Sequence, residues 1–190
     1  MTLQNKPLRY LLIDTCIFDH IANSELSVQI FAIAGDAINK GYALSLSLFS
    51  IFEMVNTSTV ENELKAMAAI QGMKRFKINQ SVLLAAGRLG EFYKREGSDK
   101  EPEDGDKIIA ATAVIYNCVI FTTNGRDFPQ PFFNVIAKPI LTYTSKGKEI
   151  MLPAYLIEPD INVITRKIQE RKDEEDQFVR NLERLKPKSS

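Results

Sequence analysis

Short apolar runs alternate along this chain with longer segments in which apolar residues recur every three to four positions. Four of these runs have the length and composition of buried strands: Arg9–Ile13, Tyr42–Leu46, Cys118–Thr122 and Asn134–Ala137. Parallel strands need a long crossover between them, which is usually a helix, so this alternation is typical of a parallel sheet. The sequence therefore predicts an α/β fold whose central parallel sheet is covered by helices on both faces.

Helical periodicity fills most of the chain between these strands. The predicted helices span Ile17–Asn23, Leu26–Lys40, Ser47–Asn56, Val60–Phe76, Gln80–Arg95 and Asp106–Asn117. The polar segment Ser98–Gly105 separates the last two and is predicted to be a loop.

Composition limits the classes of protein and of mechanism. With 190 residues and 45% apolar content, the chain fits one core-bearing domain, and its 24 basic residues balance its 24 acidic ones, so net charge does not point to a nucleic-acid partner. We expect a cytoplasmic protein without a membrane partner, because Cys16 and Cys118 show no paired spacing and neither a secretory signal nor a membrane span is visible. His20 is the only histidine, which excludes mechanisms that need two imidazoles in one chain. A structural role is expected for it.

Four acidic residues stand at the ends of apolar segments: Asp14, Glu53, Asp106 and Asp127. Side chains that follow the carboxyl ends of parallel strands meet at one edge of the sheet, so these carboxylates are expected to converge. Carboxylates without histidine are typical of a site for Mg²⁺ or Mn²⁺, which most often handles phosphate esters. We therefore predict a metal-dependent nuclease in which all four are metal ligands and catalytic residues. For Asp14 alone, a helix cap is an equally good interpretation.

Glu53 has the most informative local context of the four. Its helix is apolar around most of its circumference, and one narrow polar stripe carries Ser47, Ser50, Glu53 and Thr57. We expect this stripe to face a cleft; the alternative is a solvated stripe on a half-buried helix.

Several polar residues near these acids are predicted to assist them. Asp106 is interpreted as the ligand and Asp104 as a helix cap or accessory residue. Thr15, Ser50 and Asn124 are expected to orient ligands or water, and Arg126 to contact a phosphate. The alternative for Asn124 is ordinary turn chemistry, and for Arg126 a solvated charge.

The character of the chain changes after Ala137. We predict a nuclease domain over residues 1–137 and an extension over 138–190, which consists of a β-hairpin over Ile140–Leu156 and a charged helix over Asp160–Lys186. The helix either packs one stripe on its own domain or serves as an arm that binds a partner, such as the second copy in a homodimer.

Four segments of the chain together resemble the PIN-domain family, especially the VapC-type toxin ribonucleases of toxin-antitoxin pairs. They are Leu11–Phe18, Ser50–Glu53, Gly105–Ala113 and Phe121–Phe128, and in order and spacing they cover roughly residues 9 to 137. The resemblance implies a three-layer α/β/α sandwich with Mg²⁺ or Mn²⁺ held by Asp14, Glu53, Asp106 and Asp127. It also implies endonucleolytic cleavage of RNA and inhibition by a protein antitoxin that fills the site.

Other interpretations account for less of the sequence. A haloacid-dehalogenase-type phosphohydrolase needs a second aspartate two positions after Asp14, where this chain has Cys16. A receiver-like phosphoacceptor domain needs fewer distant acids. The non-enzymatic alternative is a catalytically silent PIN-like scaffold that binds RNA or a protein.

Overall fold

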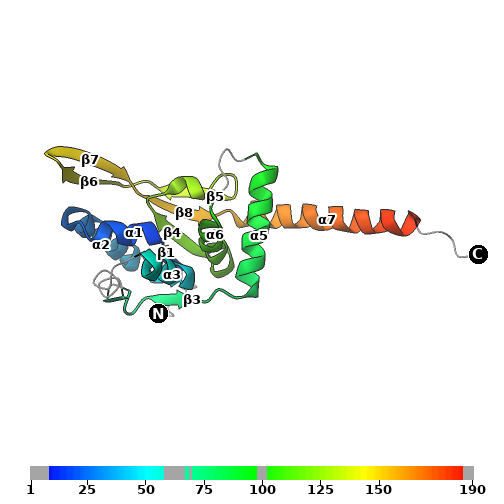
Figure 1. Cartoon of the computed structure of the whole chain (residues 1–190), viewed down its shortest axis with the longest axis horizontal. Helices are drawn as coiled ribbons and strands as arrows, with labels where there is room; N and C mark the ends of the chain where they lie inside the picture. Colours follow the sequence, from blue (N-terminus) through cyan, green and yellow to red (C-terminus); the bar gives the residue numbers. More distant parts are fainter. Residues whose placement is uncertain (1–8, 58–66, 69, 98–101, 186–190) are drawn as a thin grey trace, which may run out of the picture.

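A computed structural model describes residues 9–57, 67, 68, 70–97 and 102–185. Its main sheet has six strands in the order β3-β2-β1-β4-β8-β5 (Figure 1). The bounds of these strands are β1 Arg9–Ile13, β2 Tyr42–Ser47, β3 Lys74–Phe76, β4 Cys118–Thr122, β5 Phe133–Ala137 and β8 Tyr155–Pro159. The strands β1 and β4 lie at its centre, in parallel register with Ile13 opposite Phe121.

Helices cover both faces of this sheet. The helices are α1 Thr15–Ile21, α2 Ser24–Asn39, α3 Leu48–Thr57, α5 Gln80–Arg95, α6 Asp104–Tyr116 and α7 Ile161–Leu185. Successive side chains of a strand point to opposite faces, so Leu11 packs in one core with α1 and α2 while Leu12 packs in the other with α5 and α6. The predicted three-layer α/β/α sandwich is thus confirmed.

One strand runs against the parallel direction that the sequence predicts. The strand β8 pairs antiparallel with both β4 and β5, whereas β1 pairs parallel with β2 and with β4. A strand from the region after residue 137 is thus built into the sheet. The short connection from the hairpin returns the chain to the sheet without a crossover helix, which imposes the antiparallel direction.

Two predicted boundaries are wrong. The helix predicted over Val60–Phe76 lies partly outside the described residues, and its last three residues form the edge strand β3, where only Phe76 is buried. The loop predicted over Ser98–Gly105 is shortened by α6, which already begins at Asp104. Acidic residues in a first helical turn are stabilised by the helix dipole, so the polar end of that segment joins the helix.

The predicted hairpin is confirmed as β6 Ile140–Ser145 and β7 Lys148–Pro153. Its two turn residues, Lys146 and Gly147, both have positive φ, as a two-residue hairpin turn requires. The hairpin packs on α2: the Gln29 amide donates to the Thr142 carbonyl at 2.7 Å and accepts the Thr142 N–H at 3.0 Å. Of the remaining predicted residues, Ala154 connects β7 to β8, and Tyr155 and Leu156 belong to β8.

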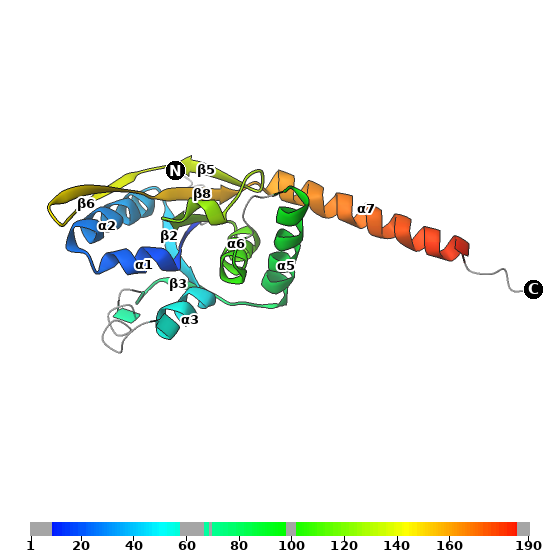
Figure 2. The ribbon, with the colours of Figure 1, turned by 45° about the horizontal axis from the view of Figure 1, so that its top comes forward.

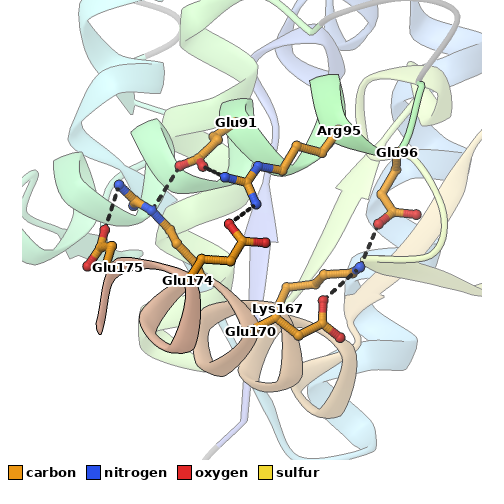
Figure 3. Close-up of polar contacts among 8 residues, drawn as sticks. Glu91, Arg95, Glu96, Lys167, Glu170, Glu174 and Glu175 are labelled. Carbon is orange, nitrogen blue, oxygen red and sulfur yellow. Dashed lines mark hydrogen bonds and ion pairs between the residues drawn. The ribbon is translucent and has the colours of Figure 1, made fainter. Parts of the chain in front are cut away.

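The charged helix α7 is anchored at its N-terminal half and extends away from the body (Figures 1 and 2). Ile164 is buried in the core with α5 and α6. Figure 3 shows the ion pairs that join α7 to α5: Arg95 with Glu174 at 2.8 Å and Lys167 with Glu96 at 2.7 Å. Exposed pairs of this kind contribute little stability each, so the packing of Ile164 matters more for the anchor.

Candidate functional site

The four predicted acids lie together beyond the carboxyl ends of β1 and β4. Asp14 directly follows β1, and Asp127 ends the short helical turn Gly125–Asp127 after β4; these two are buried, at 5% and 2% exposure. Glu53 comes from the middle of α3 and Asp106 from the first turn of α6, and both are partly buried. Asp14 and Asp127 are more than a hundred positions apart in the sequence. They converge as expected because β1 and β4 are adjacent parallel strands.

The carboxylates are close enough for their charges to raise the pKa of Asp106, Asp14 and Glu53. Burial raises the pKa of Asp106 to about 7, and the charges of Asp127, Asp14 and Glu53 add to that increase. Burial likewise raises the pKa of Asp14, with a further contribution from Asp127. For Glu53, burial and then the charge of Asp14 raise the pKa, while a hydrogen bond from Thr15 opposes them. Negative charge is therefore costly at this site.

Three donors hold Asp14: two at the start of α1 and one at the end of β4. Its Oδ1 accepts the backbone N–H of Thr15 at 2.7 Å, and its Oδ2 accepts the hydroxyl of Thr122 at 2.6 Å. The Cys16 thiol also donates to Oδ2, with an S···O distance of 3.2 Å. Asp14 thus caps α1, as the alternative interpretation held, and at the same time lies within the acidic cluster.

Thr122 and Cys16 are site residues that the sequence interpretation missed. Because Ile13 pairs with Phe121, the next residues along β1 and β4, Asp14 and Thr122, are level with each other. The signal in the sequence was a hydroxyl residue at the carboxyl end of the predicted strand Cys118–Thr122.

Glu53 is oriented by the predicted accessory residue Thr15, whose hydroxyl donates to Glu53 Oε2 at 2.5 Å. The close approach of α3 to α6 depends on Gly105. A Cβ at that position would lie 2.5 Å from Phe49 Cε1 and 3.0 Å from Glu53 Oε1. A residue larger than glycine would therefore force the Phe49 ring and the Glu53 carboxylate to shift.

The remaining predicted assistants differ in what they contact. The Asn124 amide donates to Asp127 Oδ2. The hydroxyl of Ser50 is fully buried and has no hydrogen-bond partner among the described residues. Arg126 is exposed on the short turn beside Asp127. The Nε2 of His20 lies 3.2 Å from the Thr123 hydroxyl, which fits the structural role expected for it.

Asp104 does not cap the helix, so of the two interpretations given for it, cap or accessory residue, the first is excluded. The N-cap residue of α6 is Glu103, and the Asp106 carboxylate accepts the backbone N–H of Glu103. Asp104 is exposed and pairs with Lys107 at 3.1 Å. Asp106 is the third residue of the helix. An acidic side chain at this position commonly accepts the backbone N–H of the N-cap residue.

The donor set is chemically suited to a hard divalent cation, because four carboxylates supply oxygen ligands and their mutual repulsion would be relieved by positive charge. As the side chains lie, no group of three or more His, Cys, Asp or Glu residues in the described ranges is arranged to hold a metal ion. Metal binding would therefore need side-chain rotations, and Glu53 and Asp106 are the two of the four acids that are partly exposed.

Comparison with known proteins gives the family. No family model matches the chain. It is 31% identical over 121 residues to Ribonuclease VapC19 of Mycobacterium tuberculosis, in the strains CDC 1551 / Oshkosh and H37Rv, which covers 63% of this chain and 92% of the relative.

Solved structures similar to the chain include a toxin-antitoxin complex from Klebsiella pneumoniae, with 22% identity, a TM-score of 0.48 and coverage of 64% of this chain and 92% of that one. DNA-bound VapBC from Salmonella typhimurium has 17% identity, a TM-score of 0.48 and coverage of 64% and 91%. The family assignment rests on the sequence relative, which is matched over nearly its whole length. The chain belongs to the VapC ribonuclease family of PIN-domain proteins.

Proposed function

We propose that this protein is a metal-dependent endoribonuclease that hydrolyses RNA phosphodiester bonds and acts as the toxin of a toxin-antitoxin pair. The observation that carries the proposal is the convergence of Asp14, Glu53, Asp106 and Asp127, each raised in pKa or buried, at the carboxyl edge of the sheet. The naming of the M. tuberculosis relative as a ribonuclease supports the reaction class.

The four carboxylates would hold Mg²⁺ or Mn²⁺. A bound divalent cation would activate a water and stabilise the oxygen that leaves phosphorus. The residues of the chain supply the arrangement: Thr122 and the Thr15 N–H fix Asp14, and the Thr15 hydroxyl fixes Glu53. Asn124 orients Asp127 in the same way. Contacts of this kind to ligand carboxylates set the geometry of metal sites.

Ser50 and Arg126 are proposed to contact groups that enter the site. The buried Ser50 hydroxyl lies on α3 one turn before Glu53 and has no partner among the described residues, so it is available to a water or ligand that enters the site. Arg126 is exposed next to the buried Asp127 and would contact a phosphate of the RNA. Asp104, which pairs with Lys107 on the surface, has at most an accessory role.

The catalytic chemistry falls within residues 1–137, and residues 138–190 form an extension that shares the sheet through β8. We propose that the partners are RNA, a protein antitoxin and a second copy of the chain. The Klebsiella neighbour is itself described as a toxin-antitoxin complex. No helix in the described ranges has the length and apolar content needed to span a membrane.

The test pairs metal binding with RNA cleavage on the same samples. Mn²⁺ binding is measured by calorimetry and cleavage on a pool of structured and unstructured RNAs, for wild type, Asp106→Asn and Asp36→Asn. Asp36 is exposed on α2 and serves as the matched control.

We expect binding and cleavage to be lost in Asp106→Asn and kept in Asp36→Asn. Cleavage that persists in Asp106→Asn would contradict the site assignment. Metal binding without cleavage of any RNA in the pool would favour the catalytically silent scaffold.

A further inference from the structure

Tyr93 is the second fully buried side chain whose polar atom lacks a partner among the described residues. It lies in α5 with 1% exposure, and its ring packs edge-on against Phe132, with centroids 5.5 Å apart. Its hydroxyl is buried and makes no hydrogen bond to any described residue. A buried hydroxyl without a partner costs free energy, so a position that keeps one calls for a partner in another state of the protein.

The surroundings of Tyr93 point to the start of α6. The helix α5 packs on α6, whose first turn carries Asp106. One turn before Tyr93, a Cβ at Gly90 would lie 3.3 Å from Lys107 Cδ, so this face of α5 lies against the start of α6. After burial itself, the charge of Asp106 is what raises the pKa of Tyr93, so the hydroxyl and this carboxylate are within electrostatic range.

Asp106 has another hydrogen bond in this structure. Its carboxylate accepts the backbone N–H of Glu103 at the start of its own helix. A carboxylate that rotates to place an oxygen on a cation gives up such a bond and needs a new donor to fix its orientation. A buried tyrosine held by its ring is a well-defined donor, because only the hydroxyl hydrogen has to turn.

We propose that Tyr93 is a positioning residue for Asp106, whose carboxylate accepts the Tyr93 hydroxyl when Asp106 binds the divalent cation. This inference rests on the proposed metal site and adds to it a residue outside the four acidic ligands. Tyr93 touches neither RNA nor metal; it acts through the orientation of Asp106.

The consequences differ between the metal-free and the metal-bound protein. In the metal-free protein, Tyr93→Phe removes a hydroxyl that has no partner, so the free energy of unfolding is unchanged or higher. In the metal-bound protein, the variant loses a hydrogen bond to a ligand, so Mn²⁺ affinity falls by about 10-fold or more. A purely structural tyrosine would show neither this difference nor a selective loss of affinity.

The matched control is Tyr116→Phe. Tyr116 lies at the other end of α6, and its hydroxyl donates to the Lys77 carbonyl at 3.3 Å. This variant loses an existing hydrogen bond, so it lowers the stability of the metal-free protein and leaves Mn²⁺ affinity unchanged. The two tyrosine variants thus make opposite predictions for two measurements.

The experiment combines urea unfolding without metal, Mn²⁺ calorimetry and a spectroscopic measurement. Protein labelled with [13C]tyrosine is titrated with diamagnetic Mg²⁺, and the Tyr93 Cζ resonance, assigned through Tyr93→Phe, is followed by NMR. We expect this resonance to shift in wild type and to stay unchanged in Asp106→Asn.

The outcomes separate this inference from the proposed function. Wild-type Mn²⁺ affinity in Tyr93→Phe, with affinity lost in Asp106→Asn, would overturn the role of Tyr93 and leave the metal site standing. No Mn²⁺ binding by wild type would overturn the metal site, and this inference with it. Lower metal-free stability in Tyr93→Phe would show that the hydroxyl already has an acceptor, and would also contradict the proposal.

Discussion

The Thr15 hydroxyl donates to Glu53 Oε2 at 2.5 Å and so joins the start of α1 to the middle of α3. The residue before Thr15 is Asp14, so a single stretch of two residues supplies one carboxylate of the cluster and orients another. Two helices from different parts of the chain are thereby tied to one point at the end of β1.

Thr15→Val keeps the shape of the side chain but removes this hydrogen bond. We expect Mn²⁺ affinity to fall by about 10-fold, because the orientation of a ligand carboxylate is lost. The free energy of unfolding should change by only about 1 kcal/mol. Thr15→Ser, which keeps the hydroxyl, is the control, measured by calorimetry and urea unfolding. Equal affinity in the valine variant and wild type would contradict the role assigned to Thr15.

The stability of the metal-free protein should fall as pH rises from about 4 to about 7. Asp106 has its pKa raised to about 7 in the folded state, and Asp14 and Glu53 are raised as well. The folded state therefore binds more protons than the unfolded state in this range, and the stability present at low pH is lost as these groups ionise. Urea unfolding in the presence of chelator, at intervals from pH 4 to 8, measures the slope. Asp106→Asn should flatten it, and an unchanged slope would exclude Asp106 as its source.

Mg²⁺ should raise the melting temperature at pH 7.5, where the carboxylates are ionised, and much less at pH 5. A ligand that binds only the folded state stabilises it in proportion to the logarithm of its concentration over Kd. Calorimetric melting over a range of Mg²⁺ concentrations, in Ca²⁺-free buffer, tests this. The variant Asp106→Asn is the control. The same increase in the variant would locate the ion elsewhere.

Gly105→Ala should destabilise the protein by about 1–3 kcal/mol, because the new Cβ overlaps the Phe49 ring, which must shift out of its packed position. Gly87→Ala is the matched control in α5, since a Cβ there meets nothing within 4 Å. It should stabilise the protein by about 0.5–1 kcal/mol through helix propensity alone. Urea unfolding measures the stability of both variants. Equal changes in the free energy of unfolding would show that Phe49 moves aside at no cost.

The outer half of α7 is predicted to mediate the homodimer. Phe178 and Val179 are 63% and 52% exposed on a helix that extends beyond the body, and apolar side chains at such a position are typical of a contact with a partner. Replacing both by serine should halve the particle mass in light scattering. The control replaces Gln177 and Arg180, on the opposite side of the helix, by serine. A wild type that is already monomeric would contradict the prediction.

The acidic site was predictable because its geometry follows from topology. Residues that follow the carboxyl ends of parallel strands lie at one edge of the sheet, which was enough to predict that Asp14, directly after β1, and Asp127, in the turn after β4, converge. Thr122 and Tyr93 were harder to predict, because a threonine in a strand and a tyrosine on an apolar helix face are ordinary core residues. Their significance depends on which atoms the fold brings beside them.

The mistakes in the fold have local physical causes. Lys74–Phe76 has too few residues to show a strand period, and its pairing with β2 is decided by the sheet edge. The direction of β8 depends on the hairpin that precedes it and on its pairing with β4 and β5, which lie on the other side of that hairpin in the sequence and which no local pattern encodes. Asp104 and Asp106 are both good first-turn residues, and only the helix start at Asp104 decides between them.

The position of β8 between β4 and β5 sets an order for folding during synthesis. A nascent chain that has emerged only as far as Ala137 contains β5 but not β8, the strand with which β5 pairs, and the edge of β4 that β8 covers is still open. The sheet closes only when residues up to Pro159 have left the ribosome. Until then, a cell that makes this protein holds all four acids of the site on a chain whose sheet is still open.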